Sequence, residues 1–441
     1  MPHPKVISLL SPWRRGNRIK LSLLMLLLAA ASGSIDSVAH LPEVYGRDYV
    51  RARNHVHELP VKPPSAPAIS VPDRGQIDRQ QSQLKAAEHA DGPYADGLTD
   101  PLVNLAAMYR HQGDLEKSVE QYLRALHLVR INDGLYSERQ IPIMRELMAL
   151  YRGQNDLQSL GGLYHYYARV LKLGRSPLDS GKVDDALEYL RWERELYSTR
   201  RDGMQRIHLA RAYEVNENLL ESLEPVAVRN RDAYLQLALS QMQNLYLLLG
   251  DDPLSTLPGN QTNDRPEAAK AERTVGWIQK IALAEGRKIL ERCLSLTADA
   301  PAATRAGLHL ELGDWHQWND DLNRARVHYM EVMTILSDAG EEGLLDQWLG
   351  QPMELPDEGD MWGILDRFAV DREAVVEASY AVTSRGTAQA ISVSVSDDVY
   401  GGHARQIKRM LRETHFRPRY DRDGPQVAER VTRYYRLVDI P

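Results

Sequence analysis

Apolar residues recur along most of the chain at the spacing of helix faces, and the pattern is clearest in residues 102–125. Two stripes follow one another there, and each repeats every three to four residues, as one face of a helix does. The stripes consist of Leu102, Leu105, Ala106 and Tyr109, and of Leu115, Ser118, Tyr122 and Ala125. Gly113 lies between them and can adopt the left-handed backbone that ends a helix. The pattern predicts a hairpin of two helices that pack against each other.

The hairpin pattern returns further along the chain. Its first-helix residues recur as Met144, Leu147, Met148 and Tyr151, as Leu209, Ala210 and Tyr213, and as Leu312 and Gly313, which Ala325 and Tyr329 follow on a second helix. Tyr151 comes 42 residues after Tyr109, and His316 takes the place of this tyrosine in the last copy. One hairpin of this kind cannot bury its apolar face alone, so the pattern predicts a stack of hairpins.

These residues resemble the tetratricopeptide repeat, which has Leu, Ala and Tyr on its first helix, a turn Gly, and small and aromatic residues on its second. The resemblance implies an α-solenoid over residues 78–347 with a concave binding side. Carried over to this chain, the exposed inner positions of the groove include Arg110, His111, Arg145 and Arg152. The three arginines could clamp the carboxylates of a peptide, or they could form a basic face that only water contacts.

Near the C-terminus the helical spacing gives way to a period of two. Apolar and polar residues alternate in 375–382 and again in 387–396, on either side of Gly386, which predicts a β-hairpin. Residues 403–413 then have the spacing of an amphipathic helix, and residues 426–438 alternate once more. The pattern predicts a small α+β domain.

This order of elements, with the stretch RPRYDRDG (Arg417–Gly424) before the last strand, resembles the C-terminal domain of TonB energy transducers. The resemblance assigns residues 371–441 to such a domain. In that family the closing strand lies at the edge of the sheet and accepts an extended peptide from a partner. The residues that the resemblance implies for this contact are Val427, Arg430, Val431, Arg433, Tyr435 and Arg436. The alternative is an edge strand whose arginines serve only to prevent self-pairing.

The N-terminus has the plan of an export signal. Four basic residues within 14–20 precede an apolar run, Leu21–Ala31, and small residues follow it. The run is shorter than the roughly 20 residues that span a bilayer, so we expect a signal peptide in 1–33, with a short uncleaved anchor as the alternative. Proline-rich residues 34–77 predict an extended leader, and 348–370 read as an acidic connector. We expect a periplasmic protein, anchored to the membrane if the signal is not cleaved.

Composition and motifs argue against several classes of function, namely nucleic-acid binding, metal binding and catalysis. The chain has 441 residues and a formal net charge of -7, which gives no reason to expect a nucleic-acid partner. Its single cysteine, Cys293, excludes an internal disulfide and a multi-cysteine metal site. No Gly-rich phosphate loop, nucleophile motif or zinc-type spacing is present in the sequence. The sequence therefore predicts a protein that is not an enzyme and has no cofactor and no metal site.

The sequence as a whole favours a mainly α protein, an α-solenoid of tetratricopeptide-like hairpins followed by a small α+β domain of the TonB C-terminal type. The predicted function is that of a protein–protein interaction scaffold. The solenoid groove would hold a protein or peptide, and the C-terminal domain would contact an outer-membrane or other cell-envelope protein. The alternative is a TonB-type energy transducer to outer-membrane transporters, which would need an uncleaved membrane anchor.

Overall fold

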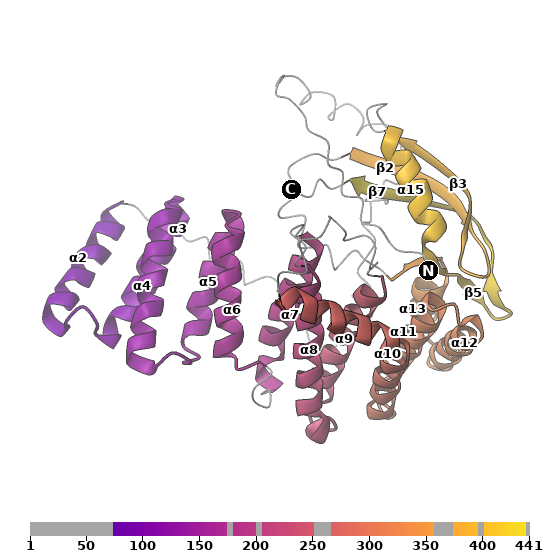
Figure 1. Ribbon diagram of the computed structural model, residues 1–441, viewed down its shortest axis with the longest axis horizontal. Coiled ribbons are helices and arrows are strands. Elements are labelled where there is room, and N and C mark those ends of the chain that lie inside the picture. Colours follow the sequence, from indigo (N-terminus) through magenta and orange to yellow (C-terminus); the bar gives the residue numbers. More distant parts are fainter. Residues whose placement is uncertain are drawn as a thin grey trace. The chain divides into compact units, whose positions relative to one another are not determined.

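The computed structural model describes residues 74–173, 180–199, 205–250, 266–356, 374–395 and 401–437. These residues are mainly helical, with thirteen α-helices and short strands near the C-terminus (Figure 1). They divide into two compact units. Of the described residues, those within 54–196 and 208–241 form the first unit, and those within 197–207 and 242–441 form the second. The predicted signal in 1–33 lies outside the described residues.

The described part of the first unit is helical. Its helices are α2 (Arg74–Asp91), α3 (Thr99–Gln112), α4 (Leu115–Asp133), α5 (Gln140–Gly153), α6 (Leu157–Val170), most of α7 (Val183–Thr199) and α8 (Gln205–Leu223), and the first half of α9 (Arg231–Gly250). Short 3-10 turns lie at η1 (Asp96–Leu98), η2 (Ser180–Lys182) and η3 (Glu224–Val226). Contacts join α2 to α3, α3 to α4, α4 to α5 and α5 to α6, so consecutive helices pack side by side.

The second unit combines helices with strands. Its helices are α10 (Pro266–Leu296), α11 (Ala302–Trp318), α12 (Leu322–Asp338), α13 (Glu342–Leu349) and α15 (Gly401–Glu413). Its strands are β1 (Met353–Leu355), β2 (Ala374–Val382), β3 (Ala388–Val395), β4 (His415–Arg417), β5 (Arg419–Asp421), β6 (Gly424–Gln426) and β7 (Ala428–Leu437). The strands expected from the period of two correspond to β2, β3 and β7, and the expected helix corresponds to α15.

The hairpins α3–α4, α5–α6 and α11–α12 turn in the same way. Each turn has a residue with left-handed backbone, namely Gly113 (φ 82°), Asn155 (φ 56°) and Asp320 (φ 62°). An aspartate follows and caps the next helix by accepting the backbone N–H of the third residue after it, as Asp114, Asp156 and Asp321 do. The N–H of that aspartate donates to the carbonyl five residues earlier, in Tyr109, Tyr151 and His316. These shared contacts align the three hairpins residue by residue.

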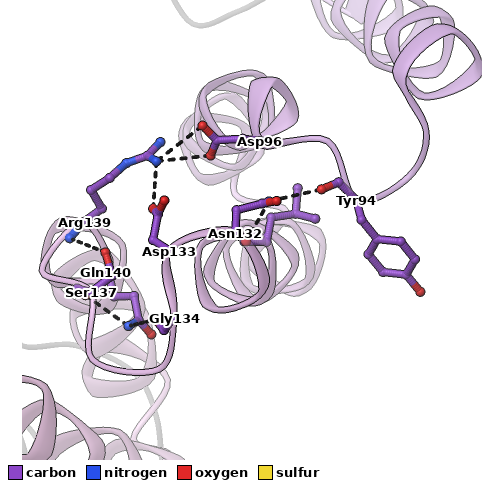
Figure 2. Close-up of polar contacts among 9 residues, drawn as sticks. Tyr94, Asp96, Asn132, Asp133, Gly134, Ser137, Arg139 and Gln140 are labelled. Atoms are coloured by element: carbon purple, nitrogen blue, oxygen red, sulfur yellow. Dashed lines mark hydrogen bonds and ion pairs between the residues drawn. The ribbon is translucent and has the colours of Figure 1, made fainter.

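Polar side chains fix the loop between α4 and α5 (Figure 2). Gln140 is fully buried, and its amide donates to the carbonyl of Ser137 at 3.0 Å. The guanidinium of Arg139 lies 2.7 Å from the carboxylate of Asp133 and 3.1 Å from that of Asp96. Because Asp96 precedes α3 and Asp133 ends α4, Arg139 ties the start of the second hairpin to both helices of the first.

A continuous apolar core lies between helices α2 to α7 of the first unit. Large side chains that expose 2% or less of their surface form its centre, namely Leu105, Tyr122, Leu147, Tyr167 and Trp192. Tyr122 and Leu147 come from different hairpins, so stacking buries what a single hairpin would expose. Among the helices that the structure describes, none is long and apolar enough to cross a membrane.

The described strands form three small antiparallel sheets. The largest has the order β3-β2-β7, while β1 pairs with β4 and β5 pairs with β6. Helix α15 packs along β3 (Figure 1). Leu411 of α15 joins Tyr380, Phe416 and Val431 in a small apolar core. Within the described strands β7 is bonded to β2 alone, so it forms one edge of the sheet.

The segment that the sequence treats as a connector, 348–370, is partly structured. Trp348 and Leu349 are buried at the end of α13, and β1 (Met353–Leu355) pairs with β4. Sequence patterns missed this strand because its three residues are flanked by proline and its partner lies about 60 residues further along the chain. The rest of the connector lies outside the described residues.

Candidate functional site

The arginines expected to line a groove lie on the first helices of the hairpins, and each contacts an acidic residue of the next hairpin or helix. Arg110 on α3 pairs with Glu146 on α5, and both side chains remain about 40% exposed. Arg145 on α5 pairs with Asp185 on α7 and lies 3.6 Å from Glu188. The structure therefore links successive first helices by ion pairs.

The third arginine, Arg152, is the most buried of the set. Its guanidinium donates to both carboxylate oxygens of Glu195, at 2.8 and 3.0 Å, and the two side chains expose only 10% and 2% of their surface. Trp192 also lies against it, with the guanidinium carbon 5.5 Å from the centre of the ring. Burial opposes the charged form, but Glu195 and Tyr164 together outweigh this effect and hold the pKa of Arg152 above its usual value.

These contacts change what the arginines offer to a ligand. A ligand carboxylate would have to compete with Glu146, Asp185 or Glu195 for its guanidinium. Of the three arginines, Arg110 belongs to the ion pair with the most exposed acid, and His111 beside it is exposed. Carboxylate binding by Arg110, His111, Arg145 and Arg152 stays a prediction.

Breaking the buried pair should cost more than breaking the exposed one. We expect Glu195→Ala to lower the free energy of unfolding by about 2–3 kcal/mol, because it leaves the Arg152 charge buried without this carboxylate. Glu146→Ala, the matched control, should cost less than about 1 kcal/mol, as is usual for exposed pairs. Urea unfolding of the full chain, followed by circular dichroism, measures both. Equal losses would contradict this ranking.

The last hairpin uses the same helix positions to hold strand β4. The shared turn geometry aligns Asp314, Gln317 and Trp318 with Ala107, Arg110 and His111 of the first hairpin and with Ala149, Arg152 and Gly153 of the second. Asp314 accepts hydrogen bonds from Arg417 Nη1 at 2.9 Å and from the hydroxyl of Tyr329 at 2.8 Å. Both members of the Asp314–Arg417 ion pair expose only 6% of their side chains.

The carboxyl group of Asp314 is buried beside the two groups that donate to it. Burial raises the pKa of this carboxyl above its ordinary value, while Arg417 and Tyr329 oppose the shift by stabilising the carboxylate. Burial and the nearby carboxylate also raise the pKa of Tyr329 well above its usual value. Tyr420 packs on Tyr329, with ring centres 4.8 Å apart, and closes the site from β5.

Further contacts extend this docking along β4 and the β2–β3 turn. Gln317 donates to the backbone carbonyl of Arg385 at 2.9 Å, and the rings of Trp318 and His415 meet edge to face. Gly386 has a left-handed backbone (φ 77°), and a Cβ at this position would collide with the carbonyl oxygen of Phe416. The close approach explains why the turn needs glycine.

The residues expected at the strand edge lie in β7 or directly before it. Val427 is exposed and precedes β7, and Arg430 is exposed within it. Val431 is 5% exposed and packs in the core, so its side chain is not at the surface of the edge. Arg433, Tyr435 and Arg436 pair by backbone with Ala378, Val376 and Val375 of β2, and their side chains lie outside the described set.

The sequence did not reveal which side chains the predicted residues contact. The Asp314–Arg417 pair joins residues 103 positions apart, which no local pattern reveals. A signal was available, because aspartate stands at a position where the aligned first two hairpins have alanine. An aspartate at this position can accept a hydrogen bond from another element, which the alanines of the first two hairpins cannot do.

No metal centre is evident in the described part of the chain, where no three His, Cys, Asp or Glu side chains are placed to hold an ion. Cys293, the single cysteine of the chain, is buried. A scan against protein-family models finds no match for this chain, and a search of curated proteins finds no relative.

Proposed function

We propose that this protein is an interaction scaffold of the cell envelope, built as a tetratricopeptide-like solenoid with a TonB-like C-terminal domain. One observation carries the proposal. The first helix of the last hairpin holds part of a folded domain through Asp314, Gln317 and Trp318. The aligned positions of the first two hairpins include exposed residues, of which His111 and Ala149 are examples. A helix face that holds a protein segment in one hairpin is suited to do so in the others.

The C-terminal domain supplies the second contact in this proposal. Strand β7 forms an edge of the described sheet, and an extended peptide can pair with such an edge through main-chain hydrogen bonds. The arginines of β7 would favour an acidic peptide over a second copy of the same strand. The partner would be an outer-membrane or other envelope protein, in keeping with the export signal expected in 1–33.

The alternative of an energy transducer is less well supported. Force transfer to a transporter across the envelope would be served by a C-terminal domain free to extend away from the rest of the chain. Here β4 and β5 pack on α11 and α12 through the buried Asp314–Arg417 pair and the Tyr329–Tyr420 contact. The alternative also depends on an anchor within residues that the structure does not describe.

Site-specific photo-crosslinking in living cells tests both contacts, whatever the identity of the two partners. A photoreactive amino acid at Ala149 should give an adduct with one protein, and the same group at Arg430 an adduct with another, because both positions are exposed on the proposed surfaces. Glu120 on α4 and Lys288 on α10 are exposed control positions and should give neither adduct.

The strand-edge contact has a separate control. Arg430→Glu combined with Arg436→Glu should weaken the Arg430-region adduct, read from a crosslinker at Val427, while circular dichroism stays unchanged. Adducts of equal strength at the control positions, or none at Ala149 and Arg430, would refute the scaffold. If the adduct at Ala149 persists in the charge-reversed variant, the variant has lost binding at the β7 edge alone.

A further inference from the structure

Residues 401–437 are strongly basic, although the chain as a whole is acidic. Residues 401–437 contain ten Lys and Arg and four Asp and Glu, a formal charge of +6, while the whole chain has -7. The remaining residues therefore carry -13 between them. Such an asymmetry creates a local field that attracts anions, even though the net charge of the protein is negative.

Helix α15 presents part of this charge as a single row. Arg405, Lys408, Arg409 and Arg412 follow the spacing of one helix face, and Leu411 on the other side is buried. The three arginines are exposed and Lys408 is partly so. The seven steps of helix from Arg405 to Arg412 span about 10 Å, so four cations lie within that length. We call these four residues the basic stripe.

The basic stripe is poorly neutralised by its surroundings. Arg409 lies 3.1 Å from Glu413, whose carboxylate is the acidic partner that the structure gives the stripe. Arg405, Lys408 and Arg412 have no ion pair within the part of the chain that the structure describes. Like charges three and four residues apart on a helix repel one another and destabilise it. Solubility alone would not require four cations on the same helix face.

We propose that the basic stripe of α15 is a docking surface for an anionic phospholipid bilayer. A row of cations on the convex face of a helix, backed by a sheet, fits a flat array of phosphates better than it fits a single small anion. Arginine is suited to this role because its planar guanidinium can donate two parallel hydrogen bonds to one phosphate. This inference does not depend on the proposed scaffold function, since it concerns α15 and not the hairpins or the β7 edge.

The expected binding is electrostatic and reversible. Each Lys or Arg near an anionic membrane surface strengthens partitioning by about fivefold, and the effect fades within about 10 Å at moderate salt. The exposed residues of α15 that the structure describes are Arg405, Arg409 and Arg412, and none of them is apolar. The contact should therefore not require insertion into the hydrocarbon core. Binding should therefore fall steeply as salt is raised.

Flotation of the full chain with lipid vesicles tests the proposal. Vesicles rich in phosphatidylglycerol should retain the protein at low salt, and neutral phosphatidylcholine vesicles should retain much less. Replacing Arg405, Lys408 and Arg412 with Glu should reduce binding to the anionic vesicles by about 100-fold or more, because three favourable charges become repulsive. The neutral vesicles also measure any contribution from the apolar N-terminal segment, which is the same in every variant.

A matched variant separates the stripe from overall charge. Arg273, Lys280 and Lys288 are exposed on α10, and replacing them with Glu changes the net charge by the same amount. This control should retain most of the binding. Equal losses in the two variants, no preference for anionic vesicles, or tighter binding to a DNA duplex than to the vesicles would each overturn the proposal. Circular dichroism of both variants confirms that folding is unchanged.

Discussion

Asp314→Ala is expected to lower the free energy of unfolding of the second unit by about 3–5 kcal/mol, the usual cost of removing one partner of a buried ion pair. The substitution would leave the Arg417 guanidinium buried at 6% exposure without its carboxylate. It would also remove the acceptor of the Tyr329 hydroxyl. Urea unfolding of the full chain measures the loss, and proteolysis should begin near β4, which this pair holds against α11.

A double variant distinguishes the lost ion pair from a general fault of packing. Replacing Asp314 with Leu and Arg417 with Met removes both charges and keeps most of the volume, so part of the stability should return. If the double variant is no more stable than Asp314→Ala, the buried charge is not the cause of the loss. If Asp314→Ala costs less than about 1 kcal/mol, the pair is solvated and holds little, as exposed pairs do.

The helices and strands could be predicted where the pattern is local. The hairpin expected in 102–125 forms as α3 and α4 with Gly113 at the turn, because spacing, cap and turn residue all favour the same structure. The strand expected around 375–382 forms as β2, next to β3. In these segments the deciding interactions lie within a few residues of one another, and the sequence displays them directly.

The state of the candidate arginines could not be predicted in the same way. Arg110, Arg145 and Arg152 sit on the helices where the repeat pattern expected them, but their partners lie 36 to 43 residues further along. Whether a guanidinium meets an acid of the next hairpin depends on how the two hairpins pack. Spacing along one helix contains no information about that packing, so it cannot tell a free clamp from a structural ion pair.

The packing of the C-terminal domain on α11 and α12 also could not be predicted from local sequence patterns. The closing strand and the hairpin before it follow a simple alternation, yet β4 and β5 contact α11 and α12 through residues about 100 positions away. The consequence is functional, because a domain fixed to the last hairpin presents β7 from a defined support. Sequence patterns treat such a domain as a separate module at the end of a linker.

Acid should destabilise the second unit through histidines on α11 and α12. The rings of His316 and His328 are stacked in parallel, 5.6 Å apart, and His309 Nδ1 lies 3.1 Å from His328 Nδ1. The pKa values of His316 and His328 are both lowered to about 4, mainly by burial and in addition by the like charge of a neighbouring histidine, which is His328 for His316 and His309 for His328. Arg324 adds to this effect at His316, and Asp321 opposes it.

The sign of the pH dependence follows from these lowered pKa values. Near pH 7 the histidines are neutral in both folded and unfolded chains, so their full contribution to stability is present. As the pH falls below the ordinary value of 6.5, the unfolded chain binds protons that the folded chain does not, until the folded pKa near 4 is reached. By about pH 5 the two histidines together should cost about 2–4 kcal/mol.

Replacing His316 and His328 with Asn removes this proton uptake and should flatten the dependence on pH. We expect the wild-type chain to lose more stability between neutral pH and about pH 5 than the double variant does, by the same 2–4 kcal/mol, in urea unfolding at each pH. His111→Asn is the matched control, because that histidine is exposed, and it should behave like the wild type. The decisive quantity is the difference in slope, not the stability at one pH, since the substitutions also remove packing between α11 and α12. If the double variant and the wild type lose stability in parallel, the stacked histidines are not what makes the second unit sensitive to acid.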